Sequence, residues 1–427
     1  MLFGNFMMGA KSRLLPPSLP FRFFGAAVVF HVLAWALLLG WGNDLPGFLG
    51  GPGHVLAALH MITLGVLTMT AMGASFQLLP VATKRPLRSV RACKAAFWLL
   101  LLGVLGLTHG MGHDDLWAME GGGSLVVAAL TIYFALVVDN LRRVGDMRLV
   151  TDHTWLAIAC LVVLAGLGAT LIGDFATGFL PDHGAIAIAH GVIAAYGFMG
   201  MLVLGFSFIL VPLFALAPPP DEKLGRRATL SAAVALLLAL IGLTARLSPL
   251  VFLAGAVGLL AAGLHLAAMA KLMKARMRRK LGDSFLLIRL AWVLLPLTIL
   301  LGMTVEAGLV IDRSGPLFGF LLVFGWLLSF LLGVMQRIMP FLASMHSIRP
   351  GIKPALVSAL TADRPLRVHL IGHVAGLSLV AAGIVLAVPL LVRLGAACGL
   401  VGAVAFLIFA VTLWRRMHLH LNPAEIQ

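Results

Sequence analysis

The sequence predicts an all-α integral membrane protein with about twelve transmembrane helices in three pseudo-repeats of four. Of its 427 residues, 61% are hydrophobic and only 11% are charged, whereas soluble domains are about half apolar and a quarter charged. The apolar runs are about 20 residues long, which is the length of a helix that spans a bilayer. A transmembrane β-barrel would instead show alternating segments of roughly ten residues, and this pattern is not seen.

The apolar runs define twelve spans within a single membrane domain over residues 1–427. The first run (Gly25–Gly40) has no small-residue cleavage site, so we expect a retained span rather than a signal peptide. The boundaries are least sharply defined for the two closely spaced pairs of runs, 228–245 with 247–270 and 368–391 with 394–414. We place the spans at residues 23–42, 54–80, 94–109, 121–139, 154–174, 184–214, 228–245, 247–270, 286–311, 315–342, 368–391 and 394–414.

The segments that connect the spans alternate in charge. Basic segments, such as ATKRPLRSVRACK and KLMKARMRRK, alternate with acidic or near-neutral ones, such as HGMGHDDLWAMEGGG. Because basic residues accumulate in cytoplasmic loops, we expect a multi-pass protein of a bacterial-type inner (cytoplasmic) membrane with both termini in the cytoplasm. The same rule accounts for the net charge of +15, with the lipid bilayer and not a nucleic acid as the partner.

A motif of glycine and proline recurs in three of the spans. The segments GASFQLLPV, GFSFILVPL and GVMQRIMPF each place a proline seven residues after a glycine, and the prolines are 132 and 128 residues apart. Each segment closes a long span that runs from outside to inside, and a proline does least harm at a helix end. We therefore expect pseudo-repeats at about 20–140, 150–270 and 285–415, with spans 2, 6 and 10 equivalent.

Histidines lie in the outer halves of two of these equivalent spans. His60 of span 2 and His190 of span 6 have similar depths, about 9 Å below the start of the helix for His60 at 1.5 Å per residue. Imidazole is a common ligand of transition metals and heme, and an intramembrane histidine needs a partner, either a cofactor or a group on another helix. His31, near mid-depth in span 1, is a further candidate. His369 and His373 are expected near the inner face as polar interface residues.

Four histidines near the outer face are candidates for a copper or zinc site. His109 and His113 are four residues apart at the end of span 3, and that spacing can hold either metal. His183 is seven residues before His190 and shares its helix face. Ordinary polar residues at solvated helix ends are the alternative. The metal candidates are His54, His109, His113 and His183.

Residues 60–100 resemble the catalytic subunit of the heme–copper oxidase superfamily. The stretch HMITLGVLTMTAMGASFQLLPVATKRPLRSVRACKAAFWLL is similar to that family's second helix and loop, with a heme-ligating histidine, a glycine, a proline twenty residues on, a basic loop and FWLL. The resemblance implies that His60 ligates a low-spin b-type heme and that His190 corresponds to a histidine that ligates copper. It also implies a twelve-helix fold over nearly the whole chain.

The chain departs from the family where the oxygen-reducing centre would be. Phe318 and Phe320 stand where the family's tenth helix has two heme-ligating histidines, and the seventh span has no His-His pair. The family's sixth helix has a tyrosine four residues after its histidine, whereas Tyr196 lies six residues after His190. The chain therefore resembles a divergent member, comparable with the small heme-associated NnrS-type membrane proteins linked to nitric oxide metabolism.

The first hypothesis is a membrane b-type heme protein with His60 and His190 as axial ligands. Two protein ligands favour electron transfer from a donor protein or quinol, whereas one ligand leaves a position for nitric oxide or oxygen, as in a heme-dependent oxidoreductase. One alternative is a heme-free protein that handles copper or zinc at an outer-face site formed by His54, His60, His109, His113, His183 and His190, and another is a transporter without a cofactor. Charge is almost absent at mid-depth, which weighs against an ion-coupled transporter. The three cysteines form no CxxC pattern, which argues against zinc ribbons, iron–sulfur clusters and c-type heme.

Overall fold

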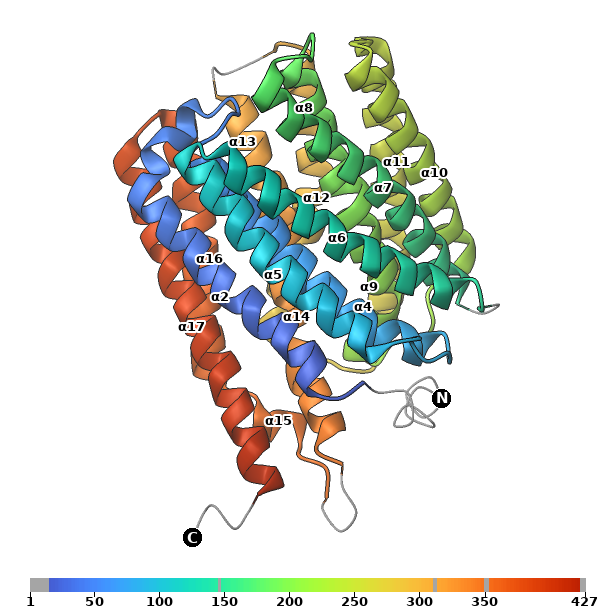
Figure 1. Ribbon diagram of the computed structural model, residues 1–427. Helices are drawn as coiled ribbons and strands as arrows, with labels where there is room; N and C mark the ends of the chain where they lie inside the picture. Colours follow the sequence, from blue (N-terminus) through green and yellow to red (C-terminus); the bar gives the residue numbers. More distant parts are fainter. Residues whose placement is uncertain (1–14, 145–146, 310–312, 349–352, 423–427) are drawn as a thin grey trace.

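The computed structural model describes residues 15–144, 147–309, 313–348 and 353–422, and all regular structure within these ranges is helical (Figure 1). Twelve of the helical stretches are long and apolar enough to cross a membrane, which confirms the predicted fold class. The elements are α2 (Ser18–Trp41), η2 (Gly42–Gly47), α3 (His54–His60), η3 (Met61–Thr68), α4 (Met69–Ala82), α5 (Val90–His113), α6 (Leu116–Leu141), α7 (Arg148–Thr177), α8 (His183–Val192), η4 (Ile193–Met199), α9 (Gly200–Ala215), α10 (Glu222–Thr244), α11 (Ser248–Lys274), α12 (Ser284–Glu306), α13 (Ser314–Phe320), η5 (Leu321–Leu327), α14 (Leu328–His346), α15 (Val357–Leu360), α16 (Asp363–Leu386) and α17 (Pro389–Leu421).

The last two spans meet earlier than the expected ranges of 368–391 and 394–414. Helix α16 ends at Leu386 and α17 begins at Pro389. Ala387 adopts the left-handed conformation with a φ of 51°, which ends α16. Pro389 then opens α17, where a missing backbone N–H removes no helical hydrogen bond. The turn is thus set by local backbone geometry inside a stretch that is apolar throughout.

Three spans contain a π-helical segment at the same point of the repeat. Segment η3 begins at Met61, η4 at Ile193 and η5 at Leu321, so their starts are separated by the same 132 and 128 residues as the prolines. A π-helical turn is rare and is frequently found at functional sites. We infer that the three spans that contain these segments (α3–α4, α8–α9 and α13–α14) are structural equivalents.

The glycine of each motif is the place where the span approaches the first helix of its own unit. A Cβ added to Gly73 would lie 2.6 Å from the Cβ of Phe23 on α2. One on Gly205 would lie 2.7 Å from the Cβ of His153 on α7, and one on Gly333 would lie 2.7 Å from a carbonyl oxygen of α12. Small residues at such positions let helix backbones approach closely. A second set of glycines, eight residues earlier, makes similar contacts: Gly65, Gly197 and Gly325.

The prolines of the motif lie inside helices rather than at their last residues. Helices α4 and α9 end two and three residues after their prolines, but α14 continues for six residues beyond Pro340. The expectation of a proline at the helix end is therefore wrong for the third unit. Proline lacks its own N–H and crowds the preceding turn, whereas the residues after it can still donate helical hydrogen bonds.

The three repeat spans form the interior of the bundle. Within the most apolar part of each span, 67% of residues are buried in His54–Ala82, 94% in His183–Ala215 and 78% in Ser314–His346, against 22–50% in the other nine spans. The outer helices expose apolar side chains such as Leu230 and Ile371, as expected for helices that face lipid.

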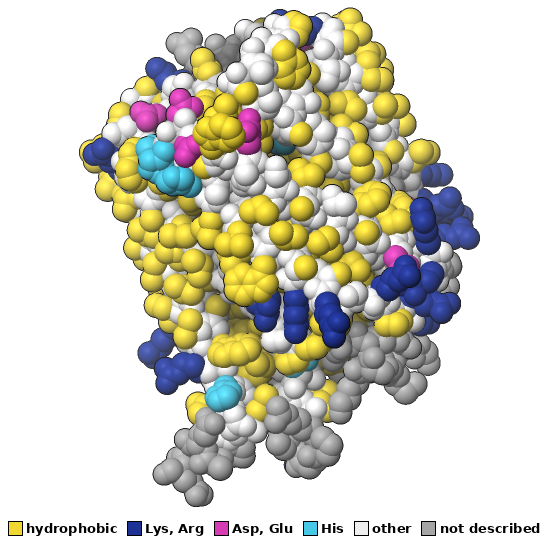
Figure 2. All heavy atoms as spheres, in the orientation of Figure 1, with side chains coloured by type: hydrophobic (Ala, Val, Ile, Leu, Met, Phe, Trp, Pro, Cys, Tyr) yellow, Lys and Arg dark blue, Asp and Glu magenta, His cyan; other side chains and the backbone are white. Residues whose placement is uncertain are grey.

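The surface carries an apolar belt with charge at its margins (Figure 2). Lysine and arginine side chains gather mainly below this belt and at the right of the view, while acidic side chains and histidines gather at the upper left. Helix α2 begins and α17 ends at the same end of the bundle (Figure 1), as an even number of spans requires. This arrangement agrees with a multi-pass protein in a lipid bilayer.

Candidate functional site

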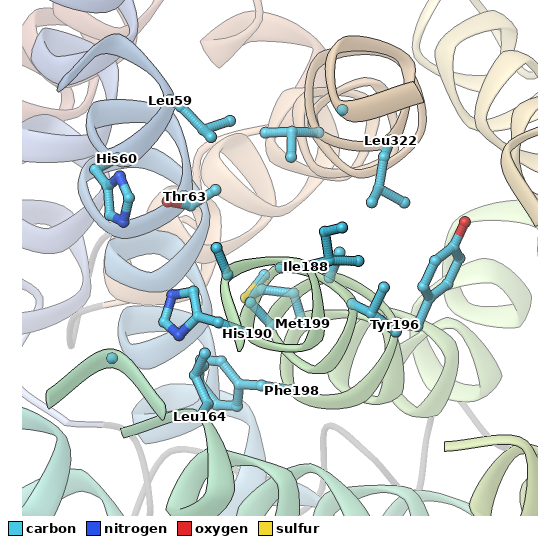
Figure 3. Close-up of a pocket in the computed structure, with 18 of the residues that line it drawn as sticks. Leu59, His60, Thr63, Leu164, Ile188, His190, Tyr196, Phe198, Met199 and Leu322 are labelled. Atoms are coloured by element: carbon cyan, nitrogen blue, oxygen red, sulfur yellow. The ribbon is translucent and has the colours of Figure 1, made fainter. Parts of the chain in front are cut away.

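His60 and His190 face each other across the interior of the bundle. His60 is the last residue of α3 and His190 belongs to α8, which are equivalent helices of the first and second units. Their ring centroids are 6.5 Å apart and their planes are inclined by 25°. Figure 3 shows the two side chains on opposite sides of one space, each with a ring nitrogen directed toward the other.

The two rings contact the surrounding helices on the sides that face away from each other. Nδ1 of His60 lies 3.0 Å from the carbonyl oxygen of Leu56, so Nδ1 carries the proton of a neutral ring and the Nε2 lone pair is free. The ring of His190 packs on α7, where a Cβ on Gly168 would stand 3.1 Å from Cε1 and 3.6 Å from Nδ1. Nδ1 of His190 is buried and makes no hydrogen bond within ordinary geometry.

The two histidines do not occupy the same position of the repeat. His60 precedes its π-helical segment directly, whereas His190 lies three residues before Ile193, which is an offset of two positions. The repeat-equivalents of His60 are Val192 and Phe320. At about 100° per residue, two positions rotate a side chain by roughly 200°. The offset therefore turns the two rings toward one shared space, whereas identical positions would point into successive spaces around the bundle.

The two rings line a cavity of about 1490 Å³. All three π-helical segments contribute to its wall, with Thr63 from η3, Met199 from η4 and Leu322 from η5 (Figure 3). The lining is predominantly apolar. Sites for one small ligand typically have volumes of about 300–1,000 Å³. The cavity is larger than this range, so its volume is sufficient for a macrocycle beside His60 and His190.

The geometry of the pair fits two axial ligands on one metal ion. The midpoint between the centroids lies about 3.2 Å from each ring, close to the sum of a ~2.0 Å metal–nitrogen bond and the ~1.2 Å from a ring nitrogen to the ring centre. Near-parallel rings with facing nitrogens satisfy the same requirement. The hydrogen bond from Nδ1 of His60 to a carbonyl is the contact that orients a metal-ligating histidine.

His31 lies in a different part of the interior from this pair and does not line the cavity. Its Nε2 accepts a hydrogen bond of 3.1 Å from Nε1 of Trp35. Its ring centroid is 6.1 Å from that of His369 on α16. His31, the further candidate heme ligand, is therefore separate from the His60–His190 pair and contacts Trp35 and His369 instead.

The four outer-face histidines divide into two separate environments. The His54 ring stacks on Trp41 at 4.3 Å and lies 5.9 Å from the ring of His113, which in turn lies 4.4 Å from His109. Nδ1 of His183 instead lies 2.7 Å from a carboxylate oxygen of Asp174. Throughout the described ranges, no group of three or more His, Cys, Asp and Glu side chains is arranged to hold a metal ion. The expected single cluster of His54, His109, His113 and His183 is not formed.

A buried group of histidines between α2, α14 and α16 was not anticipated as a group. Nε2 of His373 lies 2.8 Å from Oγ of Ser329, and Nδ1 of His369 lies 3.1 Å from Nε2 of Gln336. Both histidines are almost fully buried within the bundle. Their expected position near the inner face of the membrane stays a prediction. The four-residue spacing of His369 and His373 indicates that they share one face of a helix. Their contact with His31 could not be predicted, because it depends on how α2 packs against α16.

Comparison with known proteins identifies the fold. No family model matches the sequence, and no curated protein matches it. Among solved structures, the chain is similar to a heme–copper terminal oxidase determined by cryo-EM as a dimer, with a TM-score of 0.66 and 12% identity over 96% of this chain and 85% of that chain. The protein therefore has the membrane fold of a heme–copper terminal oxidase, built from twelve candidate transmembrane helices.

Proposed function

We propose that this chain is a membrane b-type heme protein in which His60 and His190 would hold the heme iron, and that it transfers electrons. The observation that carries the proposal is the facing pair of imidazoles at 6.5 Å. A bound heme would supply a one-electron change of its iron, tuned by the axial ligands and by burial. The similarity in fold to a heme–copper terminal oxidase supports this class of cofactor.

The residues of the chain would prepare the site before any cofactor enters. The Leu56 carbonyl oxygen accepts a hydrogen bond from Nδ1–H of His60, which would leave the Nε2 lone pair for the iron. Gly168 leaves the space that the His190 ring occupies against α7. The apolar wall around both rings excludes water, which shifts the potential of a buried redox centre.

Electron transfer is favoured over gas chemistry because two protein ligands, His60 and His190, would hold the iron. Binding of nitric oxide or oxygen would need one of the two positions open. The positions of the third unit that correspond to His190 and His60 are Phe318 and Phe320, so that unit supplies no further axial histidine there. The donor would be a redox protein or a lipid-soluble quinol.

The proposal is tested by the absorption spectrum of the protein purified after expression with adequate heme. We expect a Soret band and the sharp α and β bands of a six-coordinate low-spin heme after reduction. His60→Ala and His190→Ala should each abolish or shift these bands. The reduced wild-type protein should not bind carbon monoxide, whereas a single-ligand variant that retains heme should bind it.

His31→Ala is the matched control, because His31 is a buried histidine of α2 that does not line the cavity. It should leave the spectrum unchanged. Absence of any Soret band from the wild-type protein would refute the proposal. Full retention of the bands in both single variants would show that the ligands lie elsewhere.

A further inference from the structure

The C-terminal end of α5 carries two histidines that the proposed heme site does not use. His109 and His113 lie four residues apart in the last turns of the helix, and both side chains are exposed. Their ring centroids are 4.4 Å apart and their planes are inclined by 31°. Neither residue lines the cavity beside His60 and His190. The pair is therefore a separate surface feature that is accessible from outside the bundle.

Neighbouring segments hold the backbone of this turn in place. Asp114 adopts the left-handed conformation with a φ of 56° and ends α5. Asp115 then accepts a hydrogen bond from the N–H of Ala118 as the N-cap of α6. The N–H of Gly53 donates to the carbonyl oxygen of Met111 at 2.6 Å, which connects the start of α3 to the same turn. The two histidines thus belong to a turn that is supported on both sides.

One hydrogen bond selects the tautomer that a metal ligand needs. Nδ1 of His113 lies 3.1 Å from the carbonyl oxygen of His109. A carbonyl oxygen only accepts, so Nδ1 of the neutral ring carries the proton and Nε2 keeps its lone pair. Contact of the second ring nitrogen with a backbone carbonyl is the usual way in which metal-ligating histidines are oriented. The ring of His113 is therefore prepared to bind a metal ion through Nε2.

The local charge favours a cation. Carbonyl groups at the C-terminus of a helix carry a partial negative charge. Asp114 and Asp115 follow His113 directly, and the sequence has no lysine or arginine between Lys94 and Arg142. The helix end and the two carboxylates thus add negative charge beside the exposed imidazoles.

The separation of the two rings distinguishes between metal geometries. A metal–nitrogen bond of ~2.0 Å places the ion about 3.2 Å from each ring centre. Two rings at a right angle around one ion then have centres about 4.5 Å apart, and two rings at the tetrahedral angle have centres about 5.2 Å apart. The observed 4.4 Å matches the right angle of tetragonal copper(II). The ring of His54, which stacks on Trp41, is 5.9 Å from that of His113 and does not match it.

We propose that His109 and His113 form a two-histidine chelate for one copper(II) ion, with water in the remaining coordination positions. The ion binds without a change of oxidation state, so occupancy of the site needs no electron donor. Copper(II) is preferred over zinc(II) because of the right angle between the ligands and because nitrogen ligands form more stable complexes with copper(II). The site lies apart from the cavity and does not depend on a bound heme.

The test is titration of the full chain, purified without a histidine tag and held in lipid nanodiscs, with copper(II) and zinc(II) salts. Calorimetry gives the affinity and the stoichiometry, and electron paramagnetic resonance of the added copper(II) counts its nitrogen ligands. We expect one copper(II) ion per chain with two imidazole nitrogens. Zinc(II) should bind at least about tenfold more weakly.

His109→Ala and His113→Ala each remove one ligand. Each variant should bind copper(II) at least about tenfold more weakly, because the gain from two linked ligands is lost, and its resonance spectrum should show one nitrogen fewer. His54→Ala is the matched control, since it removes a neighbouring histidine outside the chelate. This variant should keep both the affinity and the two-nitrogen spectrum.

Three results would overturn the inference. Binding of several ions with affinities that neither His109→Ala nor His113→Ala changes would show adventitious binding only. An equal loss in His54→Ala would mean that the ion is held between α3 and α5, and tighter binding of zinc(II) would exclude selection by a right angle. The same titration with His60→Ala separates this site from the heme proposal, because copper(II) binding should be retained there even when the heme bands are lost.

Discussion

The imidazoles of His60 and His190 lie 6.5 Å apart with planes inclined by 25°, although the two residues are offset by two positions in the repeat. This offset is the feature that converts two equivalent helices into a facing pair. A chain with perfect internal symmetry would place one histidine in each of two different spaces. The pair is thus a departure from the repeat, built on backbones that otherwise follow it.

The offset predicts that a histidine at position 192, the repeat-equivalent of His60, will not take over the role of His190. The double variant His190→Ala/Val192→His moves the imidazole by two residues, or roughly 200° around the helix. We expect it to fail to restore the low-spin spectrum that His190→Ala loses. Visible absorption of the reduced protein measures this, and full recovery of the bands would contradict the facing geometry.

Gly168 is predicted to control the position of the His190 ring. In Gly168→Ala the new Cβ would stand 3.1 Å from Cε1 of His190, so the ring must shift by a few tenths of an ångström. We expect a displaced heme midpoint potential and weaker heme retention, measured by redox titration and by transfer of heme to an apo-acceptor protein. Gly166→Ala is the control, because a Cβ at this position meets nothing within 4 Å. If both variants changed the midpoint potential and heme retention equally, the contact between Gly168 and the His190 ring would not be the cause.

Gly205 is predicted to be essential for the packing of α9 on α7. In Gly205→Ala the Cβ would lie 2.7 Å from the Cβ of His153, and such overpacking costs about 1–3 kcal/mol. Thermal denaturation in detergent should show a clearly lowered Tm. In Gly191→Ala the added methyl group meets nothing within 4 Å, so this helical position should gain slightly in stability. A Tm of Gly205→Ala at or above the wild-type value would be incompatible with the close contact.

The N-terminal end of α10 is predicted to make a pH-dependent contribution to stability. Asp221 lies 2.7 Å from Nζ of Lys271 and also accepts hydrogen bonds from the backbone N–H groups of Lys223 and Leu224. The Lys271 ammonium, followed by these N–H groups, lowers the pKa of Asp221 below its ordinary value. The stabilisation is therefore complete above the ordinary aspartate pKa of about 4 and is lost as pH falls through the lowered pKa.

Asp221→Asn should accordingly lower the Tm at pH 7, and its difference from the wild-type protein should shrink on acidification. Differential scanning fluorimetry from pH 7 into the acid range measures both effects. Glu222→Gln removes the same charge one residue further on and is the matched control. A difference for Asp221→Asn that stays constant with pH would exclude the ionised carboxylate as its source.

Much of the fold could be predicted because its determinants are local in the sequence. The apolar lengths set the number of spans, since a helix needs about 20 residues to cross a bilayer. The glycine–proline motif located the equivalent spans because the same close approach to a neighbouring helix needs a small residue in each unit, at Gly73, Gly205 and Gly333. The positions of the π-helical segments were not anticipated, because no residue type specifies them.

The site was predictable only in part. His60 and His190 stood out because an imidazole in hydrocarbon is costly without a partner, and their depths follow from counting residues along a helix. His31 stood out for the same reason, yet it packs with Trp35 and His369. Depth is encoded along the chain, but the direction in which a side chain points depends on the rotation of its helix.

The sequence by itself thus determined the fold class, the number of apolar spans and the recurring glycine–proline motif, and it singled out His60 and His190 as residues of the apolar spans. Only the tertiary structure decided that His60 meets His190, that His31 joins His369 and His373, and that Tyr196 and Thr298 border the same cavity as the histidine pair. The physical reason is that hydropathy and helix length are properties of single segments. Contacts across the bundle depend on the azimuth of each helix, which is set by glycine contacts and π-helical turns shared between segments far apart in the chain.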